Sequence, residues 1–330
     1  MTRALQNIPK KILIEGKRSS CTRASNNKNF SVTIGIPAYN ERGRICYILQ
    51  QVLSQCRCLV DELIINTSGS TDGTQEEVSS IVKKGNTCQP IKIINKTERA
   101  GKAAALNDIL EACKTDIIVF MDGDVKLGKN CVRELLRLFF HANVGVVSGN
   151  VMPLNNESGG LFSHFSWIER QLHHKLCMDL VRRGKAPKVN GTFFALRRSV
   201  TNHLPRQTVS DDEYVSWCAQ KKGYRVAYAP NAIVYTKDPD NYRDYIAKRR
   251  RIFTGHFFIK RTRGYSVPTT RFGEIAPELF RFLVREKKET LKVMAMLFLQ
   301  CVSYILALSD TAGWKIPYRY RVESGKFSPR

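Results

Sequence analysis

The sequence predicts a doubly wound α/β fold, in which helices cover both faces of a mainly parallel sheet. From residue 32 onwards, short β-rich runs alternate with amphipathic helical patterns. One run, Asp116–Met121 (DIIVFM), is apolar after its first residue, which is typical of a central parallel strand. Apolar residues make up 43% of the 330 residues, and this is enough to form a core.

The first half of the chain gives the clearest alternation. Apolar residues recur with a 3.6-residue period after Gly43, which indicates a helix. The expected strands are Val32–Pro37, Glu62–Asn66, Ile91–Asn95 and Asp116–Met121, and the expected helices are Arg44–Gln55, Thr74–Lys84 and Gly101–Cys113. Such β-α-β-α order places ligands at the carboxyl ends of the strands.

The second half is less regular. Ser210 and Glu213 have the spacing of a capping box, so we expect a helix from Asp211 to Lys222 that stops at Gly223. The other expected elements are strands Val144–Val151, Thr192–Leu196 and Arg225–Ala229 and a long helix near Leu161–Arg182. Residues 242–330 are expected to be mostly helical and are heavily basic.

The chain is expected to have three parts: a basic tail over 1–30, an α/β domain over 31–240, and a basic helical region over 241–330. The tail carries seven Lys/Arg residues and no long apolar core, so we expect no signal peptide, with Ile12–Ile14 as a short anchor. The run Val293–Leu308 is sixteen residues long, short of the roughly 20 that a spanning helix needs. A tilted span, an interfacial helix and a core helix all fit it.

The net charge of +24, from 53 Lys+Arg against 29 Asp+Glu, requires an anionic partner. Nucleotide diphosphates, phospholipid head groups and nucleic acid all satisfy this requirement. The ten cysteines include no CxxC pair, so we interpret them as reduced thiols, which favours the cytosolic side of a membrane. His173 and His174 lack partner ligands at metal spacing, and a surface or interface role is favoured for both.

Two carboxylates follow the most apolar strand directly, in Asp122-Gly123-Asp124. The strand end delivers them to the ligand edge of the sheet, and the glycine between them permits a tight turn. Carboxylate oxygens are preferred ligands of hard divalent cations. The pattern therefore predicts a cation that bridges a diphosphate, although a solvated turn has the same composition.

Six segments occur in an order that resembles the family 2 glycosyltransferases, which have the GT-A fold, over about residues 32–255. They are Ile36–Glu41, Gly69–Thr74, Arg99–Asn107, Asp122–Asp124, Asn190–Ala195 with Arg197, and Asp211-Asp212. The resemblance implies an inverting enzyme that takes a sugar from a nucleotide diphosphate sugar. A UDP-sugar is favoured and a GDP-sugar also fits.

The resemblance also implies roles for individual residues. Asp212 would be the general base, and Asp124 with Asp122 would hold the divalent cation, Mn or Mg. The donor-binding residues would be Pro37, Ala38, Tyr39, Glu41, Ser70, Asp72, Lys102, Asp122, Asp124 and Arg251. Gly191, Thr192 and Asp211 would lie on the acceptor side.

The sequence departs from the family pattern at two places. In Lys248–Gly255, Arg251 aligns with the family's diphosphate-binding arginine, but Lys248 replaces a glutamine and Ile252 replaces a tryptophan that holds the acceptor in processive synthases. Polymer synthesis is therefore not favoured. Asn66-Thr67-Ser68 stands where the family has an acidic residue near the nucleotide base, and Asn66 and Thr67 are expected to contact the base instead.

We expect the acceptor to be lipid-linked or another glycan near the membrane, because the basic residues flank the apolar run. The enzyme would then work at the cytoplasmic face, on an anionic membrane surface, either peripherally or with a single C-terminal membrane segment. A nucleic-acid-binding or RNA-modifying protein is the main alternative, but no stacking platform or RNA-binding motif supports it. A nucleotidyltransferase is not favoured, because residues 38–43 do not have the pattern of a glycine-rich loop. The oligomeric state is left open.

Overall fold

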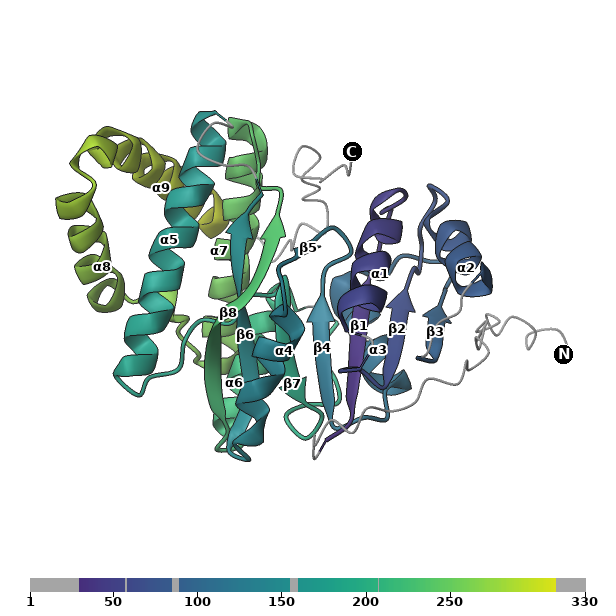
Figure 1. Ribbon diagram of the computed structural model, residues 1–330. Helices are drawn as coiled ribbons and strands as arrows, with labels where there is room; N and C mark the ends of the chain where they lie inside the picture. The colour runs from purple at the N-terminus through teal and green to yellow at the C-terminus, as the bar shows by residue number, and fades with distance from the viewer. Residues whose placement is uncertain (1–29, 57, 85–88, 155–159, 207, 313–330) are drawn as a thin grey trace, which may run out of the picture.

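The computed structural model describes residues 30–56, 58–84, 89–154, 160–206 and 208–312. Their strands form one eight-stranded sheet in the order β3-β2-β1-β4-β7-β6-β8-β5 (Figure 1). The tail over 1–30 and the short anchor Ile12–Ile14 expected within it lie outside the described residues, apart from residue 30.

The first half of the sheet is parallel, as the sequence predicts. Its strands are β1 (Val32–Pro37), β2 (Glu62–Asn66), β3 (Ile91–Ile94) and β4 (Ile117–Met121), and the connecting helices are α1 (Arg44–Gln55), α2 (Thr74–Lys84) and α3 (Lys102–Ala112). β1 pairs in parallel with both β2 and β4. The carboxyl ends of these strands therefore meet at one edge of the sheet.

The second half of the sheet changes direction. Its elements are β5 (Lys126–Leu127), α4 (Cys131–Arg137), β6 (Val144–Pro153), α5 (Leu161–Arg182), β7 (Phe193–Arg197), α6 (Asp211–Lys221) and β8 (Arg225–Thr236), with a 3₁₀ turn at Leu138–Phe140. β7 runs antiparallel to both β4 and β6. The loop before β7 consequently arrives at the edge where β4 ends, and Thr192 accepts a hydrogen bond from Asp122 there.

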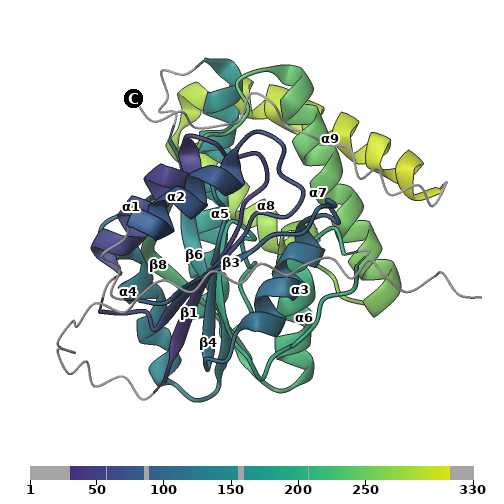
Figure 2. The same ribbon diagram turned by 90° about the vertical axis from the view of Figure 1, so that its right-hand side faces the viewer.

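Apolar side chains fill both faces of the sheet, because its central strands are covered on each side. One buried cluster joins the strands to α1, α2 and α4, and a second joins them to α3 and α6. Figure 2 shows the sheet almost edge-on, with α1 and α2 on one side and α3 and α6 on the other. The α/β fold class is thereby confirmed.

A group of helices follows β8. It comprises α7 (Tyr242–Arg263), α8 (Phe272–Arg285) and α9 (Thr290–Ala312), with 3₁₀ turns at Pro268–Thr270 and Lys287–Glu289. A third buried cluster unites α5 with these helices through Phe165, Tyr245, Phe282 and Met296. The expected helical region after the α/β domain is thus present, and it packs against α5 (Figure 1).

Some local expectations were wrong. Ser210 does occupy the N-cap of α6, but its side chain makes no capping hydrogen bond. Glu213 does not reach back to it, because its carboxylate is fully buried against Lys188 instead. β8 runs seven residues beyond the expected end at Ala229, through an irregularity where its register against β6 shifts. α4 and β5 were not expected as separate elements.

Candidate active site

A large cavity of about 1800 Å³ opens where the parallel strands end. It is lined by the ends of β1 and β4, the start of α3, the loop before β7, the start of α6, and one face of α7. These elements are far apart in the sequence, and the sheet topology brings them together. The predicted site residues that line it are Pro37, Ala38, Tyr39, Glu41, Lys102, Asp122, Asp124, Gly191, Thr192, Asp211, Asp212 and Arg251.

Asp122 and Asp124 form an acidic corner of this cavity, together with Glu41 from the turn after β1. Burial raises the pKa of Asp124 to about 7, and the nearby carboxylates of Asp122 and Glu41 add to the rise. Arg44 offsets it only in part, since it already forms an ion pair with Glu41. The corner therefore holds more negative charge than the protein itself neutralises.

Lys102 joins the acidic corner to the opposite wall. It is the first residue of α3, after Gly101, whose φ of 88° favours glycine. Its Nζ donates to Asp122 Oδ1 at 2.8 Å and to the carbonyl oxygen of Gly191 at 2.9 Å, and lies 3.6 Å from Asp211 Oδ2. Burial disfavours the charged ammonium, but Asp122 and Asp211 together raise the pKa of Lys102 above its usual range.

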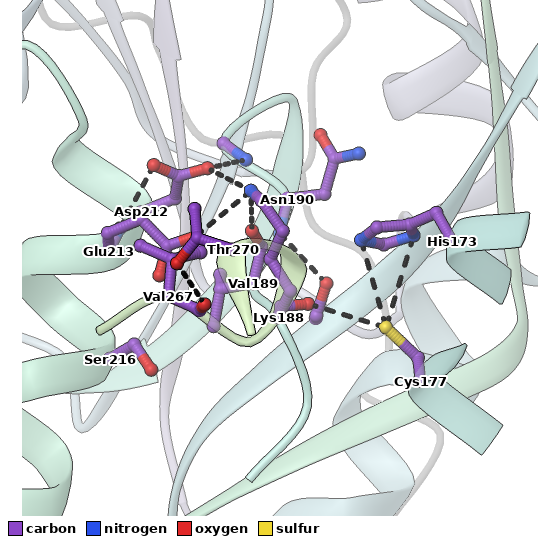
Figure 3. Close-up of polar contacts among 12 residues, drawn as sticks. His173, Cys177, Lys188, Val189, Asn190, Asp212, Glu213, Ser216, Val267 and Thr270 are labelled. Carbon is purple, nitrogen blue, oxygen red and sulfur yellow. Dashed lines mark hydrogen bonds and ion pairs between the residues drawn. The ribbon is translucent and has the colours of Figure 1, made fainter. Parts of the chain in front are cut away.

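Asp212 occupies the second position of α6, and both its oxygens are hydrogen-bonded (Figure 3). Oδ2 accepts from the backbone N–H of Gly191 at 3.0 Å and Oδ1 from that of Glu213 at 2.9 Å. Burial opposes ionisation, but Lys188 and Lys102 outweigh it, so the pKa of Asp212 lies below its usual range. Asp212 is consequently an ionised acceptor of protons that faces the cavity.

Two histidines, His173 and His256, also line the cavity. His173 was expected at a surface or interface, but it contacts Cys177, with Nε2 and Sγ 3.7 Å apart. Burial and the nearby Lys188 lower its pKa to about 3, and burial does the same for His256. Both rings are therefore neutral near pH 7. His174 is bonded to Tyr228 instead, through Nδ1 at 2.8 Å.

The end of the cavity beside β2 holds an aromatic and an acidic group. The guanidinium of Arg99 lies 3.8 Å above the centre of the Tyr39 ring. Asp108 of α3 accepts from Asn66 Nδ2 at 3.0 Å and pairs with Lys96 at 2.5 Å. Asp108 was not among the predicted site residues; it lies one helical turn after Ala104, which also lines the cavity.

Three residues expected near the nucleotide do not line the cavity. Thr67 is fully buried, and its hydroxyl points to the carbonyl oxygen of Ile94. Ser70 contacts the backbone of Ala38 and Asn40. Asp72 accepts from Thr74 and from the backbone N–H of Arg42. These side chains fix the loop that supports the turn after β1, and the donor-binding role of Ser70 and Asp72 stays a prediction.

The basic segment of α7 divides between two positions. Arg251 is exposed and lines the cavity. Lys248 is paired with the buried Asp238, which also binds Arg170 of α5 at 3.1 Å. Arg250 pairs with Asp310 of α9. The basic stretch of α7 thus supplies cations to the cavity, and two of its residues, Lys248 and Arg250, also tie helices together.

Within the described residues, no cluster of three or more His, Cys, Asp or Glu side chains has the geometry of a self-sufficient metal site. A cation bound at Asp122 and Asp124 would need further oxygen ligands from a substrate. Oxygen atoms are the ligands that a hard divalent cation such as Mn or Mg would take there.

Comparison with known proteins identifies the family. The model of the glycosyl transferase family 2 matches residues 33–204, more than half of the chain. A poly-beta-1,6-N-acetyl-D-glucosamine synthase of Staphylococcus aureus is 24% identical over 218 residues, which cover 63% of this chain and 50% of that protein. The probable glycosyltransferase YdaM of Bacillus subtilis is 25% identical over 245 residues, covering 69% and 56%. The chain therefore spans about half the length of these relatives.

The fold is shared with a solved structure. The mannosyltransferase PcManGT from Pyrobaculum calidifontis, in complex with GDP-Man and Mn²⁺, has a TM-score of 0.59 and 21% sequence identity, covering 89% of this chain and 85% of that one. The α/β domain therefore has the GT-A fold that this solved structure shares. The matched segment includes the carboxylates of Asp122 and Asp124 and the Lys102 that bonds to Asp122, and the chain belongs to glycosyl transferase family 2.

Proposed function

We propose that the protein transfers a single sugar from a nucleotide diphosphate sugar, with inversion, to a lipid-linked or other glycan acceptor at the cytoplasmic face of a membrane. The observation that carries the proposal is that one cavity contains two kinds of carboxylate, which differ in their surroundings. Asp124 is buried and crowded by the carboxylates of Asp122 and Glu41, whereas Asp212 is ionised and bonded on both oxygens. Asp122 and Asp124 suit the binding of a cation beside the leaving diphosphate. Asp212 suits the role of general base.

The residues present fit a divalent cation, Mn or Mg. Asp124 and Asp122 would hold it, since burial and the carboxylates of Asp122 and Glu41 disfavour the charge on Asp124, and a bound cation would favour that charge. When bound, the cation supplies charge that neutralises the leaving diphosphate. Lys102, bonded to Asp122 and aimed across the cavity, and Arg251 on α7 add fixed positive charge on the same side.

Asp212 would act on the acceptor. An acceptor hydroxyl oxygen attacks the anomeric carbon, and its proton passes to a carboxylate oxygen of Asp212. The bond from the anomeric carbon to the diphosphate oxygen breaks, and its electron pair leaves with the nucleotide. Attack opposite the leaving group inverts the carbon in a single step. Ile252, at the position of an acceptor-holding tryptophan in the polymer-forming synthases, supports a single transfer over processive synthesis.

The proposed donor is a UDP-sugar first and a GDP-sugar second, and the acidic group beside β2 suits both bases. Asp108 lines the cavity and retains lone pairs for an N–H donor. Uracil and guanine both present a ring N–H beside a carbonyl oxygen, which Asp108 and Lys96 could satisfy together. Tyr39 and Arg99 supply flat surfaces for a base to stack on.

The membrane association rests on α9. Among the described residues, one helical segment, Lys287–Asp310, is long and apolar enough to cross a membrane, and 22% of its most apolar window is buried. Leu291, Phe298 and Ile305 are 82%, 67% and 65% exposed. Their neighbours on the opposite face, Met296 and Ala307, are buried against the protein.

We propose that α9 lies along the membrane surface. Its inner face contacts α5 near Met296 and contacts α7 through Tyr304, whose ring is 4.9 Å from that of Phe257. α7 carries the charged residues Lys248 and Arg251 to the cavity, and such charges are costly in hydrocarbon. A helix fixed to α7 would therefore remain at the interface, with basic residues toward anionic head groups.

The first experiment is the thermal stability of the purified protein with UDP, GDP, dTDP and CMP, each with and without Mn. A ligand that binds only the folded state raises the unfolding midpoint by mass action. We expect a Mn-dependent rise with UDP or GDP. No rise with any nucleotide, in a folded sample, would argue against the donor site. Nanomolar, steeply salt-dependent RNA binding would instead support the nucleic-acid alternative.

A further inference from the structure

Lys188 lies directly behind the proposed base, in the loop that joins α5 to β7 (Figure 3). Its Nζ is 3.5 Å from Asp212 Oδ2 and 3.0 Å from Glu213 Oε1. The Lys188 side chain is only 14% exposed, and Glu213 is fully buried. One ammonium group thus touches two successive carboxylates at the start of α6.

The loop around Lys188 is held in place by its own backbone. The carbonyl oxygen of Lys188 accepts from Cys177 Sγ at 3.7 Å, and the N–H of Asn190 donates to Ser148 Oγ at 3.0 Å. The next residue, Gly191, donates its N–H to Asp212. A side chain on Gly191 would place its Cβ 3.3 Å from Asp212 Oδ2. The loop therefore presents an ammonium and an amide to the same carboxylate oxygen.

Glu213 contacts no solvent, and its Oε2 has no hydrogen-bond partner among the described residues. A fully buried carboxyl group is costly unless it is paired. Its nearest cation is Lys188. Glu213 is not among the residues that line the cavity, so its carboxyl group lies beside Lys188 and away from the reacting atoms.

We propose that Lys188 is a positioning residue for the Asp212 base: the ammonium, anchored by buried Glu213, fixes the Asp212 carboxylate toward the cavity and stabilises its charged form. The inference rests on the proposed function, in which Asp212 takes the acceptor proton. Lys188 itself forms no bond to the reacting atoms in this role.

Several charged or titratable groups face Asp212, from its own helix and from the elements packed against it. They are Asp211 and Glu213 on α6, Lys188 in the loop before β7, Lys102 on α3, His173 on α5 and His256 on α7. The two histidines are neutral above pH 4, since burial lowers their pKa values to about 3. Lys102 is already bonded to Asp122 and Gly191. Lys188 is therefore the dominant cation at Asp212, which agrees with the lowered pKa of Asp212.

Glu213 allows a clean test. Burial raises its pKa to about 7 despite Lys188 beside it, so it carries a proton throughout the range in which Asp212 titrates. Glu213→Gln mimics that neutral form, and we expect it to leave the titration of Asp212 unchanged. It also prevents an unpaired buried charge when Lys188 is removed, which protects the fold.

The experiment compares Lys188→Met and Lys188→Arg, each in the Glu213→Gln background, with the background itself. The titration of Asp212 is followed by NMR of protein labelled with ¹³C at the Asp carboxyl carbon, without metal. The Asp212 signal is assigned as the one that Asp212→Asn removes. Circular dichroism checks that every variant is folded, and Lys222→Met, at the far end of α6, is the matched control for loss of one ammonium.

We expect Lys188→Met to raise the pKa of Asp212 by about one unit or more, as loss of an adjacent opposite charge does, and Lys188→Arg to restore most of the shift. Lys222→Met should change nothing. The acid limb of nucleotide diphosphate release from a UDP- or GDP-sugar should move to higher pH in parallel. Equal Asp212 titrations in Lys188→Met and its background would overturn the inference. The NMR titration does not depend on turnover. It therefore tests the inference about Lys188 even if no transfer activity is found.

Discussion

Asp212 and Asp124 are both aspartates in the same cavity, but their surroundings shift their proton affinity in opposite directions. Two cations and two backbone N–H groups stabilise the charged form of Asp212. Burial and neighbouring carboxylates destabilise the charged form of Asp124. The same functional group can therefore serve as a base at one position and as a cation ligand at the other.

Asp212→Asn tests the base. The amide keeps the shape of the side chain but cannot accept a proton, so we expect transfer to fall by roughly 10²–10⁴-fold. Binding of the nucleotide diphosphate with Mn, measured by calorimetry, should be largely unchanged. Asp240→Asn, the same substitution at a largely exposed position, should retain full activity. Normal turnover by Asp212→Asn would remove Asp212 from the mechanism.

Asp124→Ala tests the cation site. The substitution removes one carboxylate from the acidic corner, and we expect Mn-dependent affinity for the nucleotide to fall by about 10-fold or more. The metal-free affinity should stay the same or rise, since a negative charge near the diphosphate is lost. Both affinities follow from the unfolding midpoint as a function of nucleotide concentration. An unchanged Mn-dependent stabilisation would contradict the assignment.

At the scale of elements, Asp211 and Asp212 are held in position because α7 packs closely against the start of α6. Gly255 of α7 makes this possible, because a Cβ there would lie 2.0 Å from Ser210 Oγ. We expect Gly255→Ala to destabilise the fold by about 1–3 kcal/mol and to reduce activity as α6 shifts. Gly273→Ala in α8, where a Cβ would meet nothing within 4 Å, is the control. It should be neutral or slightly stabilising, and urea unfolding measures both.

The junction of α5, β8 and α7 depends on Asp238. It is 1% exposed and lies between Arg170 and Lys248, and these two cations overcome the effect of burial and hold its pKa far below the usual range. We expect Asp238→Asn to destabilise the protein by about 3–5 kcal/mol at pH 7.

The pH dependence follows from the lowered pKa of Asp238. The stabilisation is fully present above the unfolded-state pKa of about 3.9, and it is lost as the pH falls through the lower folded-state value. The difference in unfolding free energy between the wild type and Asp238→Asn should therefore be constant from pH 7 to 5 and shrink below pH 4. A difference that is largest at acidic pH would contradict the ion-pair explanation.

At the scale of the whole molecule, the net charge of +24 and the exposed apolar face of α9 both favour binding to an anionic membrane. We expect the protein to float with vesicles that contain anionic lipid, and to release as salt screens the charges. Replacing Leu291 and Phe298 by serine should weaken vesicle binding by at least about tenfold, because each side chain contributes about 1.5–3 kcal/mol when buried. Phe140→Ser, at a 58% exposed position after α4, is the matched control. Equal flotation of the α9 variant and the control would argue against α9 as the contact.

The sequence by itself determined the α/β fold, most helix limits, and the acidic pair Asp122 and Asp124. Local patterns suffice for these, since hydrophobic period specifies a helix or strand and a motif after a buried strand lies at the ligand edge. The residue roles at the site remain predictions.

Only the tertiary structure decided which distant side chains meet those motifs. Lys188 contacts Asp212 because β7 runs antiparallel to β4 and returns its preceding loop to the cavity. Asp108 and His256 line the cavity because α3 and α7 pack beside it, and Ser70 and Asp72 are drawn into a supporting loop. No short-range spacing encodes such contacts, because they depend on the packing of whole elements whose residues are far apart in the chain.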